Sequence, residues 1–256
     1  MKTKPLSTRI STLDEQGVTI RGKDLVDELI GEVTFTQMIY LEILGRMPTP
    51  GQVRVLDALL VTLMEHGIGA ALGSRLVYMC SPESIQGAIA AGILSMGSQF
   101  GGVMEGIGRD LEAIVAAPDA DAEAARIVAG YRAARQSVPG FGHPHHRPED
   151  PRTIKLLKVA EEEGLSGRYI AALRALAKAV DASLGKHITI NATAGIAALL
   201  GELGVPWRIM RGFAAISRAP GIVGHIYEEI TQPAAFQLMS IAQDAVPYVG
   251  DIPPKK

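Results

Sequence analysis

The sequence predicts an all-α fold, a globular assembly of about ten or more helices. Three observations support this prediction. Apolar residues recur at spacings of three and four in most segments, no segment sustains an alternation of β-branched and polar residues, and most periodic segments stop at or near a glycine. A small hairpin near Thr12–Arg21 is the one expected exception.

The first helices are predicted from the residues at their ends. Thr34 precedes an apolar-periodic run and is the expected N-cap of a helix that ends near Gly45. Pro50 then takes the first position of a second helix, which leads to Glu65-His66-Gly67. The chain therefore starts with two well-marked helices after the hairpin.

The middle and late segments follow the same logic. Ser81-Pro82 is expected to open a helix that runs into a glycine turn, and the alanine-rich stretch Ala117–Arg135 is expected to form an exposed helix without a site. Near the end, Pro220 is expected to interrupt a helix and thereby expose the guanidinium of Arg218.

Length and composition exclude several classes of protein. The 256 residues suit a single domain over 1–256. A smaller helical lobe around residues 105–180 is the alternative division of the chain. Lysine and arginine number 25 against 27 acidic residues, so nucleic acid is not an expected partner. The single cysteine, Cys80, excludes an internal disulfide and is expected to be a small buried apolar residue. The polar N-terminus and the short apolar runs favour a cytoplasmic protein without a membrane segment.

The stretch Val138–Arg152, VPGFGHPHHRPEDPR, is the best candidate for a functional loop. Gly140 and Gly142 allow positive φ and a close approach of the backbone to a ligand, and Asp150-Pro151 starts a new helix. The alternative interpretation is an ordinary turn between helices whose histidines lie on the surface.

Two histidines are candidates for chemistry. His66 stands beside a glycine between two helices, and the backbone of His143 is fixed by its glycine and proline neighbours. Such a histidine can polarise a carbonyl or transfer a proton, because its ordinary pKa is about 6.5. Alternatively, backbone carbonyls satisfy each ring. His145 and His146 are interpreted as solvated loop residues.

Three arginines indicate an anionic substrate. Arg147 and Arg152 follow His143 in the loop, Arg218 lies in SRAPGIVGHIYEE, and the planar guanidinium pairs well with carboxylates and phosphates. The alternative is a set of helix-end ion pairs with Asp150, Glu228 or Glu229.

Other chemistries lack their usual motifs. Neither HExxH nor a cysteine partner accompanies the HPHH run, so no metal site is expected. The chain also lacks GxGxxG, GxxxxGK[ST] and GxSxG motifs, which removes the usual support for dinucleotide, nucleoside-triphosphate and serine-hydrolase sites.

Five separated segments together resemble the citrate synthase superfamily, and in particular its short citryl-CoA lyase branch. In chain order they are IRGKDLVDELIGEVTFTQMIYLEILGRMPTP, MEHGIGAALGSRLV, MGSQFGGVMEG, VPGFGHPHHRPEDPR and SRAPGIVGHIYEE. The resemblance runs from about Ile20 to Glu229 and implies a citrate synthase-like multi-helix fold. It also implies a lyase that cleaves citryl-CoA to acetyl-CoA and oxaloacetate.

The resemblance further implies roles for individual residues. His66 and His143 would contact the hydroxyl-bearing carbon and its carboxylate, with His143 as the proton-transfer group. Arg152 and Arg218 would bind substrate carboxylates, beside the glycine turn Phe100-Gly101-Gly102. The expected substrate is a thioester of coenzyme A, and its coenzyme A part would meet Arg147 and the backbone of Val138, Gly140 and Gly142. No covalently bound cofactor is implied, and a homodimer or higher homo-oligomer is expected.

Two departures from the superfamily pattern matter. Phe100 stands where synthases carry a histidine, which favours a lyase. The catalytic aspartate of an NVD-type segment is matched to Asn191 in TINATAG, and an amide cannot carry a proton as a carboxylate does. Asn191 could still donate a hydrogen bond to a thioester or enolate oxygen, and Asn191→Asp is expected to raise cleavage.

Three hypotheses about function follow from the sequence. The first is a lyase acting on citryl-CoA or a related 3-hydroxyacyl-CoA. The second is a divergent lyase or thioesterase acting on another acyl-CoA. The third is a non-catalytic subunit that binds CoA thioesters.

Overall fold

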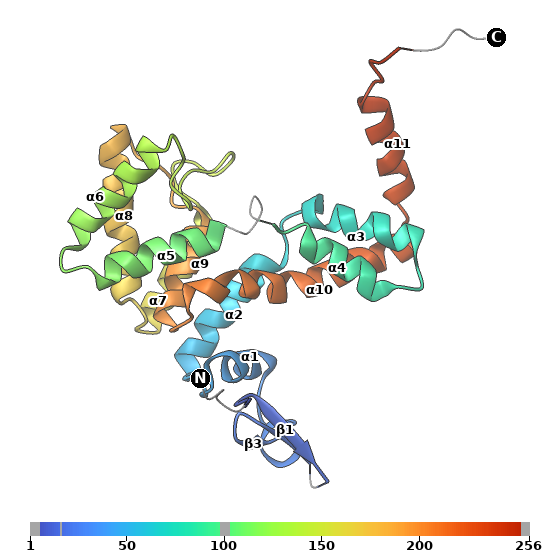
Figure 1. Cartoon of the computed structure of the whole chain (residues 1–256), viewed down its shortest axis with the longest axis horizontal. Coiled ribbons are helices and arrows are strands. Elements are labelled where there is room, and N and C mark those ends of the chain that lie inside the picture. The colour runs from blue at the N-terminus through green and yellow to red at the C-terminus, as the bar shows by residue number, and fades with distance from the viewer. Residues whose placement is uncertain (1–5, 16, 98–102, 252–256) are drawn as a thin grey trace. The chain divides into compact units, whose positions relative to one another are not determined.

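The computed structural model is dominated by helices, which confirms the all-α prediction (Figure 1). It describes residues 6–15, 17–97 and 103–251. Among these, no single helix is long and apolar enough to cross a membrane. Only the bent pair of helices α2 (Pro50–Met64) and α3 (Ile68–Cys80) passes that test when both are taken together.

The described chain forms two compact units. The larger comprises Met1–Thr62 and Val103–Arg211, and the smaller comprises Leu63–Gly102 and Gly212–Lys256. Residues 105–180, considered above as a smaller lobe, lie within the larger unit. The single domain over residues 1–256 stays a prediction.

The larger unit begins with a three-stranded antiparallel sheet of order β1-β2-β3. Its strands are β1 Ser11–Asp14, β2 Gly17–Ile20 and β3 Lys23–Asp24. The register pairs Ser11 with Ile20, which confirms the hairpin predicted near Thr12–Arg21. A short π-helix, Leu25–Leu29, leads from the sheet to the first α-helix.

Seven α-helices follow among the residues of the larger unit that the structure describes. They are α1 Phe35–Leu44, α2 Pro50–Met64 (whose last two residues belong to the smaller unit), α5 Val103–Ala116, α6 Ala120–Ala133, α7 Pro151–Glu162, α8 Arg168–Leu184 and α9 Ala192–Glu202. Local signals define several ends. Thr34 forms a capping box with Gln37, and Gly45 ends α1 in the left-handed conformation. Pro50 and Pro151 stand first in their helices, as predicted.

Helix α9 lies at the centre of the larger unit. Nine of its eleven residues are buried, and it packs against α5, α7 and α8. Its sequence, ATAGIAALLGE, supplies the small residues that let three helices approach it. The N-terminus of α9 is therefore held in a fixed place, and the functional loop described below is attached to it.

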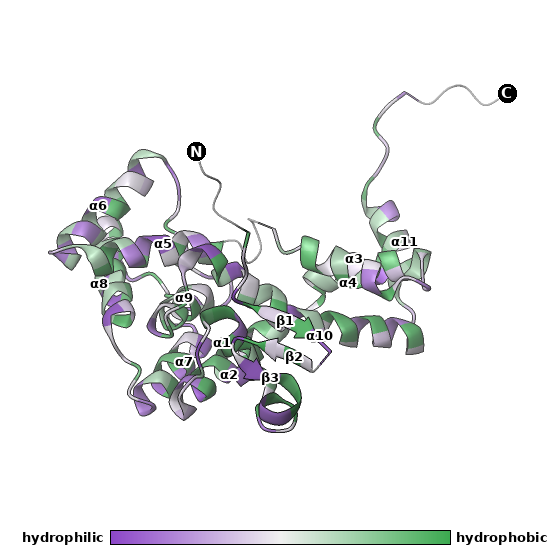
Figure 2. Ribbon diagram, turned by 60° about the horizontal axis from the view of Figure 1, so that its bottom comes forward, coloured by the Kyte–Doolittle hydropathy of each residue, from purple (hydrophilic) through white to green (hydrophobic). Residues whose placement is uncertain are grey.

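The alanine-rich helix α6 is exposed on one face only. Ala124, Ile127 and Val128 are buried, and the helix packs against α8. The ribbon of α6 alternates between purple and green in Figure 2, as expected for a helix with one apolar face. The prediction of an exposed helix is therefore confirmed for the outer face, and burial of these three side chains fixes the inner face of α6 on α8.

The smaller unit contains α3 Ile68–Cys80, α4 Ile85–Leu94, α10 Met210–Thr231, which begins in the larger unit, and α11 Ala235–Ala245. Ala88, Ile222 and Ile226 form its buried cluster. Gly92 allows α4 to pack closely, because a Cβ there would lie 2.2 Å from the Ser74 hydroxyl oxygen.

Three expectations for this unit were wrong. Helix α4 starts at Ile85 rather than at Ser81-Pro82, because those residues form a turn. Cys80 is exposed at the end of α3 rather than buried. Helix α10 continues through Pro220. Burial of side chains such as Ile222 and Ile226 offsets the cost of the proline, about 3 kcal/mol.

Candidate active site

The loop Val138–Arg152 is attached to the segment that enters α9. Phe141 and Ile190 form an antiparallel bridge. The Gly142 N–H donates to the Thr189 carbonyl at 2.8 Å, and the Asn191 N–H donates to the Gly140 carbonyl at 3.0 Å. These backbone contacts give the loop a defined conformation.

The two glycines of the loop are required by its backbone. Gly140 has φ of +85° and Gly142 has φ of +87°, a region that favours glycine. A Cβ on Gly140 would lie 2.6 Å from the Cβ of Ala194 in α9. The close approach predicted for Gly140 is therefore an approach to the first turn of α9.

Asp150 anchors the C-terminal end of the loop. Its side chain is fully buried, and it caps α7 by accepting the Arg152 N–H at 3.0 Å. It also accepts the Arg152 side chain at 3.0 Å from Nε and 2.8 Å from Nη2, and the Ala192 N–H at 3.0 Å. One carboxylate therefore joins the loop, the start of α7 and the start of α9.

The environment keeps Asp150 ionised. Burial alone would raise its pKa, but the hydrogen bonds from Arg152 and from the Ala192 N–H outweigh burial, so the pKa lies below its ordinary value. The helix-end ion pair weighed in the sequence analysis as an alternative for Arg152 is thus present. It orients the guanidinium and leaves 30% of the Arg152 side chain exposed.

His143 is held by the backbone that follows it. Its Nδ1 accepts the His145 N–H at 3.1 Å and the His146 N–H at 3.0 Å. An imidazole nitrogen that accepts hydrogen bonds carries no proton, so the neutral ring carries its proton on Nε2. His145 and His146 thus contribute through their backbone. The prediction of a solvated loop residue is confirmed for the exposed His145 and wrong for His146, whose half-buried ring lies beside that of His143, with 4.3 Å between ring centroids.

The Nε2 atom of His143 lies 3.3 Å from Nη2 of Arg152. Both atoms are donors in this tautomer, and two adjacent donors attract a shared anionic acceptor. Burial, followed by the charges of His146 and Arg152, lowers the pKa of His143 and keeps its ring neutral. The pair of N–H groups is therefore suited to a carboxylate or alkoxide oxygen.

Asn191 is engaged at both ends of its side chain. Its Oδ1 accepts the Ala194 N–H at 3.3 Å and so caps α9. Its Nδ2 donates to the Gly142 carbonyl at 3.1 Å. Asn191 therefore links α9 to the loop. It lies two residues after Thr189, whose carbonyl accepts the Gly142 N–H.

Arg147 is exposed at the surface of the loop. Its Nε donates to the His143 carbonyl at 3.3 Å, and the guanidinium forms no ion pair within the described part of the chain. Its remaining N–H groups are free to bind an anion.

His66 and Arg218 belong to the smaller unit. His66 is exposed after the end of α2. Arg218 lies on α10 with only 12% of its side chain exposed, so the expectation of an exposed guanidinium was wrong because α10 is continuous there. Its Nη1 is 3.8 Å from Glu65, and its Nε is buried without a partner within the described residues. Burial lowers the pKa of Arg218, partly opposed by Glu65.

Neither Glu228 nor Glu229 pairs with Arg218. Both pair with the buried Arg75 instead. Arg75 also contacts His225, whose Nε2 is 3.3 Å from Glu65. The ion pairs of the smaller unit thus form one chain of contacts that includes Glu65, the partner of Arg218.

A family model described as the C-terminal domain of citrate synthase matches residues 40–237, more than half of the chain. The chain belongs to the citrate synthase family. It is similar in structure to citryl-CoA lyase from Hydrogenobacter thermophilus, with a TM-score of 0.88 and 32% identity over 99% of this chain and 98% of that one.

Two more distant comparisons agree with this family. ATP citrate lyase from Methanosaeta concilii, solved with (3S)-citryl-CoA, has a TM-score of 0.76 at 17% identity, covering 99% of this chain and 43% of that one. This likeness shows the fold alone. Citrate synthase from Acidithiobacillus ferridurans is 26% identical over 204 residues, 75% of this chain and 51% of that protein. The chain thus spans about half the length of the curated relatives it matches.

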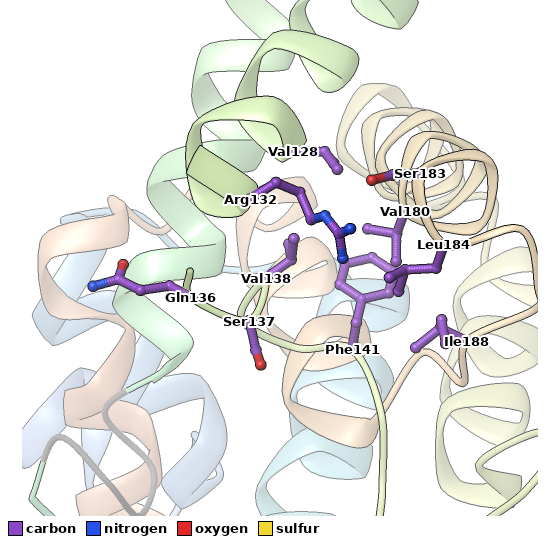
Figure 3. A pocket seen from close by; sticks show the side chains of 10 residues that line it. All are labelled: Val128, Arg132, Gln136, Ser137, Val138, Phe141, Val180, Ser183, Leu184 and Ile188. Atoms are coloured by element: carbon purple, nitrogen blue, oxygen red, sulfur yellow. The ribbon is translucent and has the colours of Figure 1, made fainter. Parts of the chain in front are cut away.

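Beside the loop of this citrate synthase family member lies a cavity of about 220 Å³. It is lined by Val128, Arg132, Gln136, Ser137, Val138, Phe141, Val180, Ser183, Leu184 and Ile188. Figure 3 shows the Arg132 guanidinium reaching from α6 toward the Phe141 ring, above an apolar floor. The Arg132 side chain has no ion pair within the part of the chain that the structure describes.

The remaining predicted site residues are Phe100, Gly101 and Gly102, which lie outside the described residues. Within the described ranges, no group of three or more His, Cys, Asp or Glu side chains is arranged to hold a metal ion. Sequence reasoning missed Thr189 as part of the site. Its Oγ1 donates to the carbonyls of Pro148 at 2.7 Å and His146 at 3.2 Å.

Proposed function

We propose that this protein is a citryl-CoA lyase-like enzyme that cleaves citryl-CoA to acetyl-CoA and oxaloacetate. The observation that carries the proposal is the pair of donors, His143 Nε2–H and Arg152 Nη2, in a chain whose full length matches the fold of a citryl-CoA lyase.

Retro-aldol cleavage places specific demands on such a site. The hydroxyl proton passes to a water molecule that acts as base, the adjacent C–C bond breaks, and its electron pair forms a thioester enolate. The enolate takes up a proton from water to give acetyl-CoA. The hydroxyl-bearing carbon becomes the ketone of oxaloacetate. The two donors stabilise negative charge on the oxygen as its proton leaves, or bind the neighbouring carboxylate.

The proton-transfer role expected of His143 from the sequence stays a prediction. In the tautomer that its neighbours favour, the ring presents Nε2–H to the substrate oxygen, so its first contribution is a hydrogen bond. The substrate contacts expected of His66 and Arg218 from the sequence stay predictions, because both residues belong to the smaller unit. The buried, unpartnered Nε of Arg218 supports a carboxylate-binding role, since a buried donor normally finds an acceptor.

Coenzyme A is proposed to bind along the backbone of Val138, Gly140 and Gly142. The adjacent cavity combines apolar side chains with the unpaired guanidinium of Arg132, which lies over the Phe141 ring (Figure 3). This combination suits a ring and a phosphate of a nucleotide. Arg147, on the same loop, supplies a second unpaired guanidinium.

Asn191 fits a positioning role, because the backbone engages both ends of its amide. In an Asn-Val-Asp segment, the aspartate follows the asparagine by two residues. Pairing that asparagine with Asn191 brings Thr193 to the position of the aspartate. The Thr193 side chain is half-buried in the first turn of α9 and makes no hydrogen bond with the described residues. Thr193 is therefore proposed to face the thioester.

The substitution of Asn191 by aspartate tests this assignment. Contrary to the expectation from sequence, Asn191→Asp is expected to lower citryl-CoA cleavage about fivefold, because a carboxylate cannot donate to the Gly142 carbonyl. Thr193→Asp is expected to raise cleavage, since it introduces the missing carboxylate at an unpartnered position. Steady-state oxaloacetate release measures both. A rise for Asn191→Asp with no rise for Thr193→Asp would return the role to Asn191.

The function itself is tested by incubating the purified protein with citryl-CoA and following oxaloacetate release at several pH values. Release above the uncatalysed background is expected. Titration calorimetry with CoA is the companion measurement. Tight CoA binding without release would exclude the lyase, and absence of both would exclude the family site altogether.

A second candidate is favoured by one observation, the lack of a carboxylate at either Asn191 or Thr193. A divergent lyase or a thioesterase acting on another acyl-CoA would tolerate this lack. A panel of acyl-CoA thioesters, assayed for free CoA and for carbonyl products, separates these activities. A non-catalytic CoA-binding subunit would bind the panel without turnover.

A homodimer or higher homo-oligomer is also proposed, with a second copy covering α11. This helix exposes Phe236 at 71% and Ile241 at 56% of their surfaces, and burial of such side chains contributes about 1.5–3 kcal/mol each. Sedimentation is expected to show at least a dimer, and Phe236→Asp with Ile241→Asp to give a monomer. The control Gln243→Glu changes an exposed polar position on α11. A dimer unaffected by the double substitution would place the interface elsewhere.

The expected cytoplasmic location stays a prediction.

A further inference from the structure

His187 lies between two carboxylates from different elements. Its Nδ1 is 2.8 Å from Asp181 Oδ2 in α8, and its Nε2 is 3.1 Å from Glu149 Oε1 in the functional loop. A neutral imidazole has only one N–H, so it would turn a lone pair toward one of these carboxylates. The doubly protonated ring satisfies both.

This cluster adjoins the contacts that shape the proposed active site. Glu149 directly precedes Asp150, which orients Arg152. On the other side, the Ile188 N–H donates to Asp181 Oδ1 at 2.8 Å. Two residues beyond His187, Thr189 binds the Gly142 N–H and the Pro148 carbonyl. His187 therefore connects the end of α8 to Glu149, next to the anchor Asp150. It also lies two residues from Thr189, which contacts the loop at Gly142 and Pro148.

We propose that His187 is a positioning residue whose imidazolium form latches the loop to α8, so that loop order, and with it cleavage, depends on pH. The effect on cleavage rests on the proposed function, whereas the effect on loop order is a property of the substrate-free protein.

The electrostatics of the cluster agree with the latch. The hydrogen bond that the His187 ring donates to Asp181, followed by the charges of Asp181 and Glu149, raises the pKa of His187. The latch is therefore complete below the ordinary histidine pKa of about 6.5 and is lost as the pH rises through the raised value. Among described residues, Asp181 on α8 and Glu149 on the loop are the ionisable groups that face the ring. Lys186 precedes His187 in the chain and forms no ion pair there.

Hydrogen exchange of the substrate-free protein tests loop order. Peptides covering residues 143–150 are compared between wild type and His187→Gln at the same pH, so that intrinsic exchange rates cancel. At pH 6 the variant is expected to exchange about three- to fivefold faster, a size typical of exposed ion pairs. Above the raised pKa of His187 the two proteins are expected to exchange equally.

The control is Lys186→Gln, which removes a neighbouring positive charge and leaves both carboxylate contacts intact. It is expected to exchange like wild type at both pH values. Equal exchange of His187→Gln and wild type at pH 6 would overturn the latch, and so would a difference that is the same at both pH values. Titration of the His187 ring by NMR must also place its pKa above about 6.5.

Kinetics test the consequence for cleavage. In wild type, kcat/KM is expected to fall at alkaline pH, whereas His187→Gln is expected to be about fivefold lower at pH 6 and to lose this fall. His187→Lys restores a cation and is expected to recover part of the rate. Absence of cleavage in wild type would contradict the proposed function and leave the exchange result standing. Normal cleavage with unchanged exchange would contradict the latch alone.

Discussion

Replacing Asp150 with alanine is expected to lower the free energy of unfolding of the larger unit by about 3–5 kcal/mol. The substitution removes a fully buried carboxylate and leaves the Arg152 guanidinium and the Ala192 N–H without their acceptor. Trp207 is the only tryptophan and lies in the larger unit, so its fluorescence during urea unfolding reports on this unit.

Two companion variants give this prediction its control. Asp121→Ala breaks the exposed pair with Lys178 and is expected to leave the unfolding midpoint within measurement error. Asp150→Asn keeps an oxygen acceptor and loses the charge. Its loss of unfolding free energy should therefore fall between those of Asp121→Ala and Asp150→Ala. The pKa of Asp150 is lowered, so its contribution is present above about pH 4 and declines as the pH falls through the lowered pKa. An Asp150→Ala midpoint equal to that of wild type would show that this carboxylate does not anchor the loop.

Replacing His143 with alanine is expected to lower kcat/KM for citryl-CoA by about 10²–10⁴-fold. The substitution removes the Nε2–H that lies beside Arg152, while the glycine-shaped backbone of the loop remains. Oxaloacetate release measures the effect, and titration of CoA shows that the cofactor-like part of the substrate still binds. Retention of a tenth of the wild-type rate would exclude a central role for the ring.

The neighbouring histidines provide matched controls for His143. His145→Ala and His146→Ala keep the backbone N–H groups that hold His143 Nδ1, so both should retain most of the activity. The pKa of His143 is lowered, so the neutral ring persists below about pH 6.5 and activity should fall only when the pH drops through the lowered value. The pKa of His187 is raised, so kcat/KM of wild type should fall at alkaline pH as well and show a bell-shaped dependence on pH.

The ends of the helices could be predicted where one residue decides them. Thr34, Pro50 and Pro151 act through their own backbone or side chain, and a local signal of this kind survives in any fold. Pro220 shows the limit. Its local preference is to break a helix, but the buried apolar face of α10 outweighs that preference, and only the tertiary structure shows that burial.

The candidate site could be predicted where its residues are neighbours in the sequence, and could not be predicted where its contacts depend on tertiary structure. Val138–Arg152 carries its glycines, histidines and arginines in one visible run. The partners that orient them come from elsewhere, because Thr189 and His187 reach the loop only after α8 and α9 have packed. One signal was available in the sequence. An asparagine directly before an alanine-rich helix is a typical N-cap, so the capping role of Asn191 could have been predicted.

The attachment of the loop to α9 has a consequence for how the site forms during folding. The contact between Asp150 and Ala192 spans 42 positions of the chain, and that between Asn191 and Gly142 spans 49. Contacts of such sequence separation close late, after local helices have formed, because the intervening chain loses entropy when its ends meet. Helicity should therefore recover before substrate binding when the protein is refolded, and a peptide of the loop alone should lack the geometry of the site.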